Sequence, residues 1–175
     1  MSSNEFRIRK TEVGDAFYLP PVERSAGQVF KSIPELAFIA DDQITDVAGH
    51  LAAIDAGKSW VAINISDSSI IGFLVGEQIG ADLYIGEFSV AAPWQGQGVG
   101  RALLKQVMLE AKREGFSRLT LTTFRDVLWN GPFYGKLGFV ILSSENTDAY
   151  LRDTLRAEAE HGIPVEQRCA MALKL

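Results

Sequence analysis

A strand, a glycine-rich loop and a helix follow one another between residues 83 and 114, and this junction constrains the fold more than any other part of the sequence. Segment 83–91 is rich in apolar residues and leads into the loop Gln95-Gly96-Gln97-Gly98-Val99-Gly100. In segment 98–114 apolar residues recur at every fourth position, at Val99, Leu103, Val107 and Ala111. That spacing predicts an amphipathic helix with a buried stripe. The chain therefore turns from strand to helix within a few residues.

The rest of the chain predicts further strands and helices around this junction. Two strands are expected just before it, over 60–65 and 70–79, and together with 83–91 they predict an antiparallel meander. The other expected strands are 6–10, 118–124, 139–142 and 166–173, and the expected helices are 20–33, 45–56, 130–137 and 147–161. The sequence thus predicts a single α/β domain over residues 1–175, with a mixed, twisted sheet of about seven strands whose N-terminal half is antiparallel, flanked by helices.

Composition and charge exclude several classes of protein. Apolar residues make up 47% and charged residues 22% of the chain, which is typical of soluble globular proteins. The net charge of −5 gives no sign of the basic surface that nucleic-acid binding requires. No apolar run approaches the roughly 20 residues that span a bilayer, and the N-terminus lacks the apolar core of a signal peptide. We expect a cytoplasmic protein without a nucleic-acid or membrane partner.

Cysteine and histidine are scarce. The single cysteine, Cys169, excludes an internal disulfide framework, and the two histidines, His50 and His161, lie far apart in the sequence. A zinc site of the usual ligand types would be hard to assemble from them. We expect no metal.

The glycine-rich loop is a candidate anion-binding site. A strand-to-helix junction directs unpaired backbone N–H groups into one space, at the positive end of the helix dipole. Glycines let an anion approach that backbone without interference from Cβ atoms. The alternative is a tight turn that binds nothing. A nucleotide P-loop would need Gly-Lys-Ser/Thr, which is missing, and a dinucleotide fold would place its turn after a buried first strand.

Two separate motifs make the chain resemble the GNAT superfamily of N-acetyltransferases. Residues 87–104 match the family's strand, Gln/Arg-x-x-Gly-x-Gly/Ala loop and helix, and residues 130–139 match its Tyr-x-x-x-Gly-Phe signature. The order of elements agrees over nearly the whole chain. The resemblance implies an enzyme that moves an acetyl group from acetyl-CoA directly to a primary amine of a small molecule or a protein, without a metal. The rival interpretation is a non-catalytic acyl-CoA-binding sensor or scaffold, which would need neither Glu87 nor Tyr134.

The resemblance also implies which residues hold acetyl-CoA. The backbone of Phe88, Ser89 and Val90 would pair with the pantetheine arm, and the loop amides from Gly96 to Arg101 would hold the pyrophosphate. The complete expected set is Phe88, Ser89, Val90, Gln95, Gly96, Gln97, Gly98, Val99, Gly100, Arg101 and Asn130. Two of these have structural alternatives. Asn130 stands closer to Tyr134 than in the commoner family pattern, so its side chain could instead cap the short helix, and Arg101 could be a solvated helix residue.

Three residues are candidates for proton transfer. Tyr134 matches the position often proposed to protonate the departing CoA thiolate, and the pKa of a phenol is comparable with that of a thiol; the alternative is a core aromatic. Glu87 shares a strand face with apolar neighbours, and burying a carboxylate among them costs free energy unless its charge is compensated. It is either a base for the acceptor amine, directly or through water, or the partner of a cation. Asp126, just past the next strand, is the second candidate base.

The identity of the acceptor is not determined by the sequence. The acidic segments 40–46 and 158–160 would suit a cationic amine or would be ordinary solvated surface. The expected partner is a small-molecule or peptide amine, and a homodimer is left open.

Overall fold

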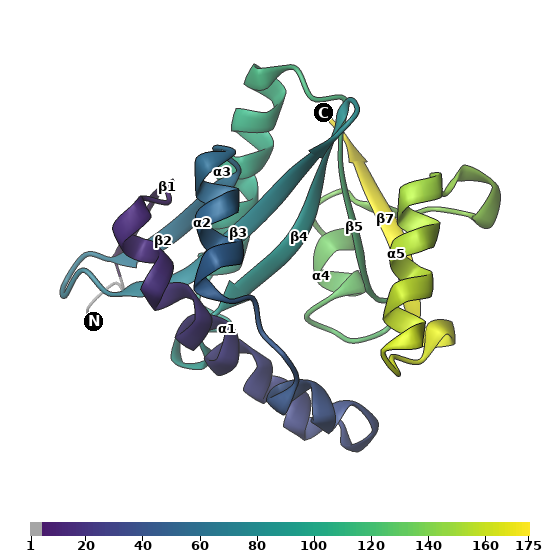
Figure 1. Ribbon diagram of the computed structural model, residues 1–175, viewed down its shortest axis with the longest axis horizontal. Coiled ribbons are helices and arrows are strands. Elements are labelled where there is room, and N and C mark those ends of the chain that lie inside the picture. The colour runs from purple at the N-terminus through teal and green to yellow at the C-terminus, as the bar shows by residue number, and fades with distance from the viewer. Residues whose placement is uncertain (1–4) are drawn as a thin grey trace. The chain divides into compact units, whose positions relative to one another are not determined.

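The computed structural model describes residues 5–175 (Figure 1). Seven strands form a mixed sheet in the order β1-β2-β3-β4-β5-β7-β6. Strand β2 pairs antiparallel with β1 and with β3, whereas β4 and β5 are parallel and β7 is antiparallel to both β5 and β6. The predicted α/β class, with a mixed sheet of seven strands and an antiparallel N-terminal half, is confirmed.

The bounds of the elements are as follows. The strands are β1 (Phe6–Lys10), β2 (Ser59–Asn64), β3 (Ile70–Ile79), β4 (Asp82–Val90), β5 (Arg118–Phe124), β6 (Val140–Ile141) and β7 (Arg168–Lys174). The α-helices are α1 (Leu19–Gly27), α2 (Val47–Asp55), α3 (Val99–Glu114), α4 (Gly131–Gly135) and α5 (Ala149–Glu160). Short 3₁₀ helices cover Val13–Tyr18, Gln28–Ser32, Pro34–Asp41, Ala92–Trp94, Ser144–Asn146 and Val165–Gln167.

The chain divides into two compact units. The first contains the described residues as far as Glu77 together with Ile85–Glu110, and the second contains Gln78–Tyr84 together with Ala111–Leu175. Strands β3 and β4 and helix α3 each contribute residues to both units.

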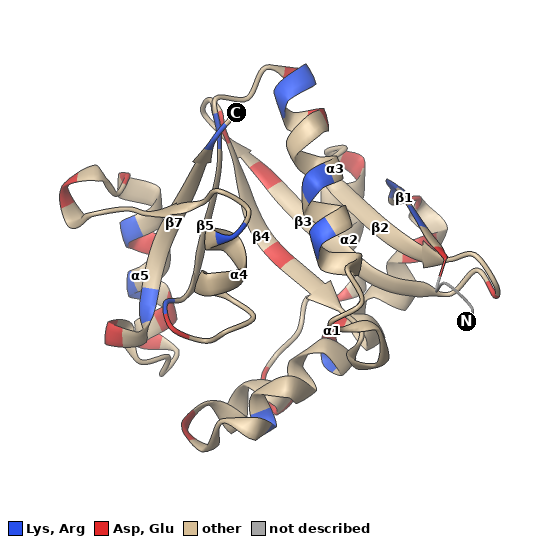
Figure 2. Cartoon of the chain, turned by 180° about the vertical axis from the view of Figure 1, so that it is seen from behind, with Lys and Arg blue, Asp and Glu red and all other residues tan. Residues whose placement is uncertain are grey.

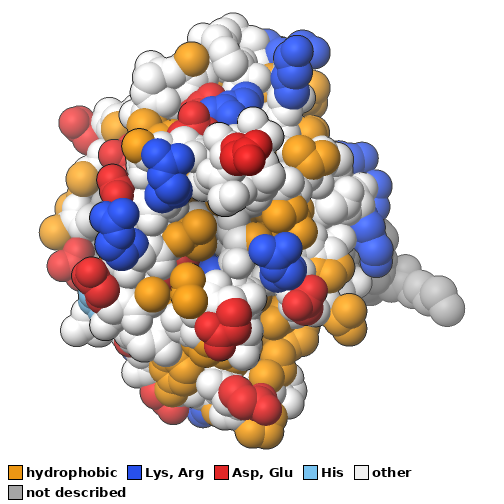
Figure 3. Space-filling model, turned by 90° about the vertical axis from the view of Figure 1, so that its right-hand side faces the viewer, with side chains coloured by type: hydrophobic (Ala, Val, Ile, Leu, Met, Phe, Trp, Pro, Cys, Tyr) orange, Lys and Arg blue, Asp and Glu red, His pale blue; other side chains and the backbone are white. Residues whose placement is uncertain are grey.

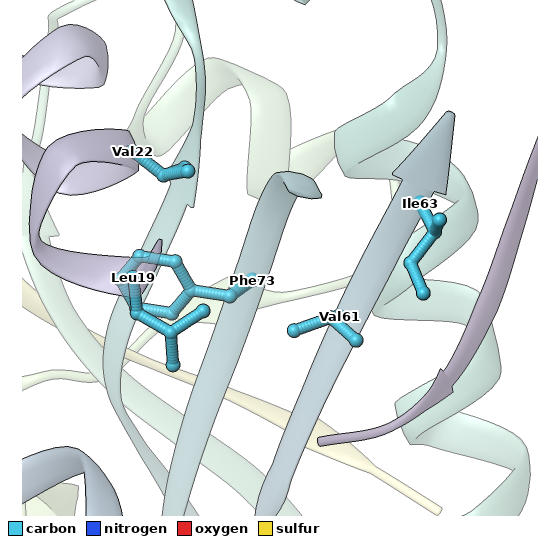
Figure 4. Close-up of a cluster of buried hydrophobic side chains, with 5 residues drawn as sticks. All are labelled: Leu19, Val22, Val61, Ile63 and Phe73. Atoms are coloured by element: carbon cyan, nitrogen blue, oxygen red, sulfur yellow. The ribbon is translucent and has the colours of Figure 1, made fainter. Parts of the chain in front are cut away.

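The core of the first unit lies between α1 and strands β2 and β3. Figure 4 shows Leu19 and Val22 of α1 beside Phe73 of β3, with Val61 and Ile63 on β2. All five are at most 6% exposed, and burying each such side chain stabilises the fold by about 1.5–3 kcal/mol. This core holds α1 on the sheet and so positions the polar side chains of the same helix.

The second unit is built on a long antiparallel pairing between β5 and β7. The pairing runs without a break from Arg118–Lys174 to Phe124–Arg168. The Arg118 guanidinium donates hydrogen bonds to both carboxylate oxygens of Asp82, at 3.0 and 2.5 Å, and to Asp148 at 2.9 Å. These bonds fasten the beginning of β4 to β5 and to the start of α5, and they support the parallel pairing of Asp82–Tyr84 with residues 118–120.

The prediction of a helix over 20–33 is wrong at the C-terminal end of that segment. Helix α1 stops at Gly27, and the chain continues through the 3₁₀ helices Gln28–Ser32 and Pro34–Asp41. Arg24 Nη1 donates to the carbonyls of Ala40 and Asp42, at 3.0 and 2.8 Å. These bonds fold the chain back on α1, and glycine is a weak helix former at the point where the α-helix ends.

The second expected helix also begins later than predicted. Asp46, not Thr45, is the N-cap of α2, and its carboxylate accepts the Gly49 N–H at 2.8 Å. The Thr45 N–H instead donates to the Glu23 carboxylate. Shifts of one or two residues affect the other expected elements that are observed as β2, β4, β6, β7, α3, α4 and α5, with the bounds given above.

Charged side chains of both signs are spread over the described surface. Basic segments lie along α3 and acidic segments on β3 and β4 (Figure 2). On the face drawn in Figure 3, acidic and basic side chains alternate with apolar ones. Within residues 5–175 no helix is long and apolar enough to cross a membrane.

Candidate active site

The glycine-rich loop has the geometry of an anion-binding site. Gly96 and Gly98 have φ values of 74° and 85°, in the left-handed region that favours glycine. A Cβ added at either residue would meet no described atom within 4 Å, so the space beside this backbone is open. Helix α3 begins at Val99, and its first turn leaves N–H groups without intrahelical acceptors at the positive end of the helix dipole. These features fit the diphosphate of acetyl-CoA.

Side chains around the loop fix its conformation. Gln95 Nε2 donates to the carbonyls of Val90 and Ala26, at 3.0 and 3.2 Å, and Ser25 Oγ accepts the Ala92 N–H at 3.0 Å. Gln97 Nε2 donates to the Pro93 carbonyl at 2.6 Å. The loop is thereby tied to the end of α1 and to the end of β4, and these two glutamine side chains serve the loop's shape. Their predicted role in binding acetyl-CoA stays a prediction.

The last residues of β4 lie unusually close to β3. A Cβ added at Gly72 of β3 would lie 3.0 Å from the Ser89 carbonyl oxygen and 3.3 Å from Val90 Cγ2. The next residue pairs normally, because the Ala91 N–H donates to the Ile71 carbonyl at 2.9 Å. Gly72 therefore allows the close approach of the segment expected to contact pantetheine. Sequence reasoning missed this residue, although a lone glycine inside a strand is a known signal of close backbone approach.

Glu87 lies half-buried on β4 in the first unit. Its Oε1 accepts the Phe88 N–H at 3.1 Å and the Ser89 hydroxyl at 2.8 Å. Burial raises the pKa of this carboxyl, and the two hydrogen bonds oppose that rise. Among the described residues, no Lys or Arg lies within ion-pair distance of Glu87. The described residues therefore give no support to the alternative role of Glu87 as the partner of a cation, and its role as a base stays a prediction.

Two residues that the sequence did not single out lie with Glu87 in the first unit. Glu23 of α1 has a side chain only 13% exposed, and its two oxygens accept the Thr45 N–H at 3.1 and 3.3 Å. Burial and the negative charge of Glu87 raise the pKa of Glu23 to about 7. His50 of α2 is fully buried, with its Nε2 3.9 Å from Glu23 Oε2. Burial lowers the pKa of His50, so its imidazole is neutral at pH 7.

The signature residues 130–139 belong to the second unit. Tyr134 of α4 is 7% exposed, and its ring contacts the edges of Phe133 and Phe139, with centroids 5.3 and 5.6 Å apart. Gly131 is required where α4 begins, since an added Cβ would lie 2.2 Å from the Arg125 carbonyl oxygen. The proton-donor role of Tyr134 stays a prediction, and its packing accounts for its burial.

Asn130 and Asp126 also belong to the second unit. Asn130 occupies the N-cap position of α4, but its side chain makes no capping hydrogen bond, and its buried Oδ1 has no hydrogen-bond partner. The alternative that Asn130 caps the helix through its side chain is therefore wrong. Asp126 lies exposed just beyond β5, and its role as a second base stays a prediction.

The remaining candidates occupy ordinary positions. Arg101 is exposed in the first turn of α3, and Cys169 is a buried free cysteine on β7. In the acidic segment 158–160, Glu158 pairs with Arg168 at 2.8 Å. No group of three or more His, Cys, Asp or Glu residues suited to a metal ion occurs within residues 5–175.

Comparison with known proteins agrees with this architecture. The model of the acetyltransferase (GNAT) family matches residues 28–139. The fold is similar to that of PaiA N-acetyltransferase from Thermoplasma acidophilum in complex with coenzyme A, with a TM-score of 0.72, 18% identity and coverage of 98% of this chain and 99% of that one. It is also similar to the ribosomal-protein-S18-alanine N-acetyltransferase of Escherichia coli (TM-score 0.68, 14% identity, 97% and 94% coverage).

A third solved structure adds a bound product. N-acetylglutamate synthase from Neisseria gonorrhoeae, complexed with coenzyme A and N-acetyl-glutamate, has a TM-score of 0.70 and 16% identity, and the match covers 98% of this chain and 35% of that one. At these low identities the solved structures show only a similar fold, whereas the family model matches more than half of the sequence. With its strand, glycine-rich loop and helix in the family's arrangement, the chain belongs to the acetyltransferase (GNAT) family and is an acetyl-CoA-dependent N-acetyltransferase.

Proposed function

We propose that this acetyltransferase acts on a primary amine, of a small molecule or a peptide, that reaches the site as an ammonium ion. The observation that carries the proposal is that two partly buried carboxyl groups of the first unit, Glu23 and Glu87, make no ion pair with a Lys or Arg among the described residues. A carboxylate that is partly withdrawn from water attracts a cation more strongly than an exposed one, because less water screens it. An ammonium ion supplies that charge.

The amine must lose a proton before it can react. An alkyl ammonium has a pKa near 10.4, so about one molecule in two thousand is free base at pH 7, a deficit of about 4–5 kcal/mol. A carboxylate next to the amine recovers part of this by accepting the proton. Glu87 is placed for this role in the proposal because it lies two residues before Ser89, on the strand expected to contact the pantetheine arm.

The other components follow from the family. The loop amides from Gly96 to Arg101 would hold the diphosphate, and the backbone of Phe88, Ser89 and Val90 would hold the pantetheine arm. Acetyl-CoA supplies an activated acetyl group as a thioester. Tyr134 would donate its phenolic proton to the departing thiolate, and a backbone N–H at Ser89 or Val90 would stabilise negative charge on the carbonyl oxygen.

The acceptors of similar structures do not transfer to this chain. Their names give an alanine of a ribosomal protein as one acceptor and N-acetyl-glutamate as one bound molecule, so one fold serves chemically different acceptors. In this chain, the partly buried carboxyl groups of Glu23 and Glu87 favour a cationic amine.

A panel of acceptors tests the proposal. The panel contains diamines, lysine peptides, amino acids and neutral hydroxyl compounds, and release of the CoA thiol is followed at pH 7.5. We expect transfer to one or more amines. Substitution Glu87→Gln should lower activity near neutrality, with partial recovery at high pH, where the amine deprotonates unaided. Transfer to hydroxyl compounds alone would refute the amine proposal. CoA binding without thiol release from any acceptor would support the sensor interpretation instead.

A further inference from the structure

We propose that Ser89 is a positioning residue for Glu87, because its hydroxyl holds the carboxylate in the orientation in which Glu87 takes a proton from the acceptor ammonium. The inference rests on the proposed function and deepens it, since it names the group that orients the proposed base. In the expected contacts with acetyl-CoA, Ser89 takes part through its backbone. The inference gives its side chain a separate role.

Strand β4 places the two side chains on one face of the sheet. Glu87 and Ser89 are two residues apart on β4, and alternate residues of a strand point to the same face. Glu87 is half-buried, and Ser89 is 6% exposed. A buried hydroxyl needs a hydrogen-bond partner. Among the described residues, the partner of the Ser89 hydroxyl is the Glu87 carboxylate.

Two donors bind the same carboxylate oxygen. The Ser89 hydroxyl donates to Glu87 Oε1 at 2.8 Å, and the Phe88 N–H donates to the same atom at 3.1 Å. Among the described residues, none donates a hydrogen bond to Glu87 Oε2. A glutamate side chain has several rotatable bonds, so without these donors the carboxylate would sample many orientations. The two bonds therefore fix the carboxylate through Oε1 and leave Oε2 to take the proton.

The Ser89 hydroxyl is the donor that does not compete with the cofactor. In the proposed function the Phe88 backbone contacts the pantetheine arm, which offers the Phe88 N–H a second acceptor. The serine hydroxyl lies on a side chain and is not part of that pairing. With acetyl-CoA bound, the Ser89 hydroxyl would therefore keep Glu87 in place.

The same hydrogen bond affects the proton affinity of Glu87. Burial raises the pKa of this carboxyl, and the Ser89 hydroxyl lowers it more than the Phe88 N–H does, because each donor stabilises the ionised form. Among the described residues, no Lys or Arg lies within ion-pair distance of Glu87. The charge of Glu87 helps to raise the pKa of Glu23 on α1, and the His50 ring of α2, 3.9 Å from Glu23, is neutral at pH 7. Removing the serine hydroxyl leaves all these groups in place.

The proton balance of the step is complete. The ammonium gives one N–H proton to Glu87 Oε2, and the freed nitrogen lone pair forms the C–N bond at the acetyl carbonyl. The C–S bond breaks, and its electron pair leaves with the CoA sulfur. The second proton, lost by the nitrogen as the amide forms, balances the protonation of the thiolate, and Glu87 returns its proton to water.

The first test compares pH profiles of kcat/KM for the wild type, Ser89→Ala and Ser89→Thr with an acceptor found in the panel. We expect the acidic limb of Ser89→Ala to move to higher pH by about half a unit to one unit, because the ionised Glu87 loses a donor. We also expect the plateau to fall about tenfold, because the carboxylate is no longer oriented. Ser89→Thr keeps a hydroxyl and should restore the limb to nearly its wild-type position. An unchanged limb or an unchanged plateau in Ser89→Ala would overturn the inference.

The matched control is Ser69→Ala, in the exposed turn between β2 and β3. The Ser69 hydroxyl donates to Asp67 Oδ1 at 2.7 Å, so this variant removes the same kind of bond from a carboxylate that is not on β4. Its pH profile should follow that of the wild type. If the limb of Ser69→Ala moved as far as that of Ser89→Ala, the shift would not come from Glu87 and the inference would fail.

A second measurement needs no acceptor. The side-chain carboxyl carbons of ¹³C-labelled glutamate are titrated by NMR in the wild type and in Ser89→Ala, and the Glu87 signal is identified by its loss in Glu87→Gln. We expect the Glu87 midpoint to rise in Ser89→Ala, and an unchanged midpoint would show that the hydroxyl does not hold the carboxylate.

The variant Glu87→Gln separates failure of this inference from failure of the proposed base. If Glu87→Gln keeps the wild-type acidic limb, Glu87 is not the base, and the positioning role of Ser89 is refuted together with it. If Glu87→Gln removes the limb while Ser89→Ala leaves both the limb and the Glu87 midpoint unchanged, the proposed base stands and the role of Ser89 alone is refuted.

Discussion

Substitution Glu23→Gln should make the protein more stable at alkaline pH, even though it alters the site. Folding raises the pKa of Glu23 from 4.5 to about 7, so the folded chain binds this proton more firmly than the unfolded chain does. Each pKa unit corresponds to about 1.4 kcal/mol. A difference of about 2.5 units therefore gives an upper value of about 3 kcal/mol for the effect of this carboxyl on the free energy of unfolding.

The sign follows from proton binding. Below pH 4.5 the carboxyl is protonated in both states, and its stabilising contribution is fully present. As pH rises from 4.5 through about 7, the folded state has to ionise a buried group beside Glu87, and that contribution is lost. Glutamine does not titrate. Relative to the wild type, Glu23→Gln should therefore gain up to about 3 kcal/mol between pH 4.5 and pH 8.

Urea unfolding at pH 4.5, 6, 7 and 8, followed by circular dichroism, measures this difference. The control is Glu77→Gln, whose difference from the wild type should stay nearly constant over the same range. A constant difference for Glu23→Gln, within about 0.5 kcal/mol, would show that Glu23 ionises normally in the folded protein. A difference of opposite sign would mean that a cation stabilises the Glu23 carboxylate in the folded protein.

Three further predictions concern the cofactor site. Gly98→Asp should abolish CoA binding measured by calorimetry, because it puts a strained backbone and a negative charge in the loop. The control is Gly14→Asp, which lies outside the loop; like Gly98, Gly14 has open space for a side chain, and this variant should bind CoA normally. Tyr134→Phe should lower kcat by roughly 10²–10⁴ with little change in CoA affinity, and an unchanged kcat would assign Tyr134 to the core alone. Gly72→Val should lower the free energy of unfolding by about 1–3 kcal/mol and weaken CoA binding, because the valine side chain would push against the Ser89 carbonyl. If this variant binds CoA with the affinity of the wild type, β4 tolerates the displacement of Ser89.

The sequence by itself determined the elements whose pattern is local and regular. The expected strands 70–79 and 118–124 are observed with those bounds, and the helix over 98–114 differs by one residue. In each of these segments the spacing of the apolar residues and the flanking turn residues predict the same element, so local preference and tertiary packing lead to the same result. The glycine-rich loop belongs with them, because its backbone geometry depends on the positive φ of Gly96 and Gly98, two glycines close together in the sequence.

The tertiary structure decided the chain between α1 and α2. Apolar residues continue at helical spacing beyond Gly27, but side-chain bonds from Arg24 and Gln28 to the Ala40 carbonyl favour a return of the chain in two 3₁₀ helices. Likewise, the Thr45 N–H is held by Glu23, and the N-cap moves to Asp46. These partners are distant in sequence, so no local pattern could reveal them.

The surroundings of Glu23 are the clearest case of this kind. Glu87 was identifiable as a carboxylate on an apolar strand face, but Glu23 and His50 resemble ordinary residues of surface helices. Folding brings the His50 ring of α2 to 3.9 Å from the Glu23 carboxylate of α1, and the negative charge of Glu87 on β4 contributes to the raised pKa of Glu23. Their proton affinities depend on burial and on mutual charge, and both arise from three-dimensional proximity alone. The sequence thus determined that this chain belongs with acetyl-transferring enzymes, and the tertiary structure decided the surroundings of Glu23, His50 and Glu87.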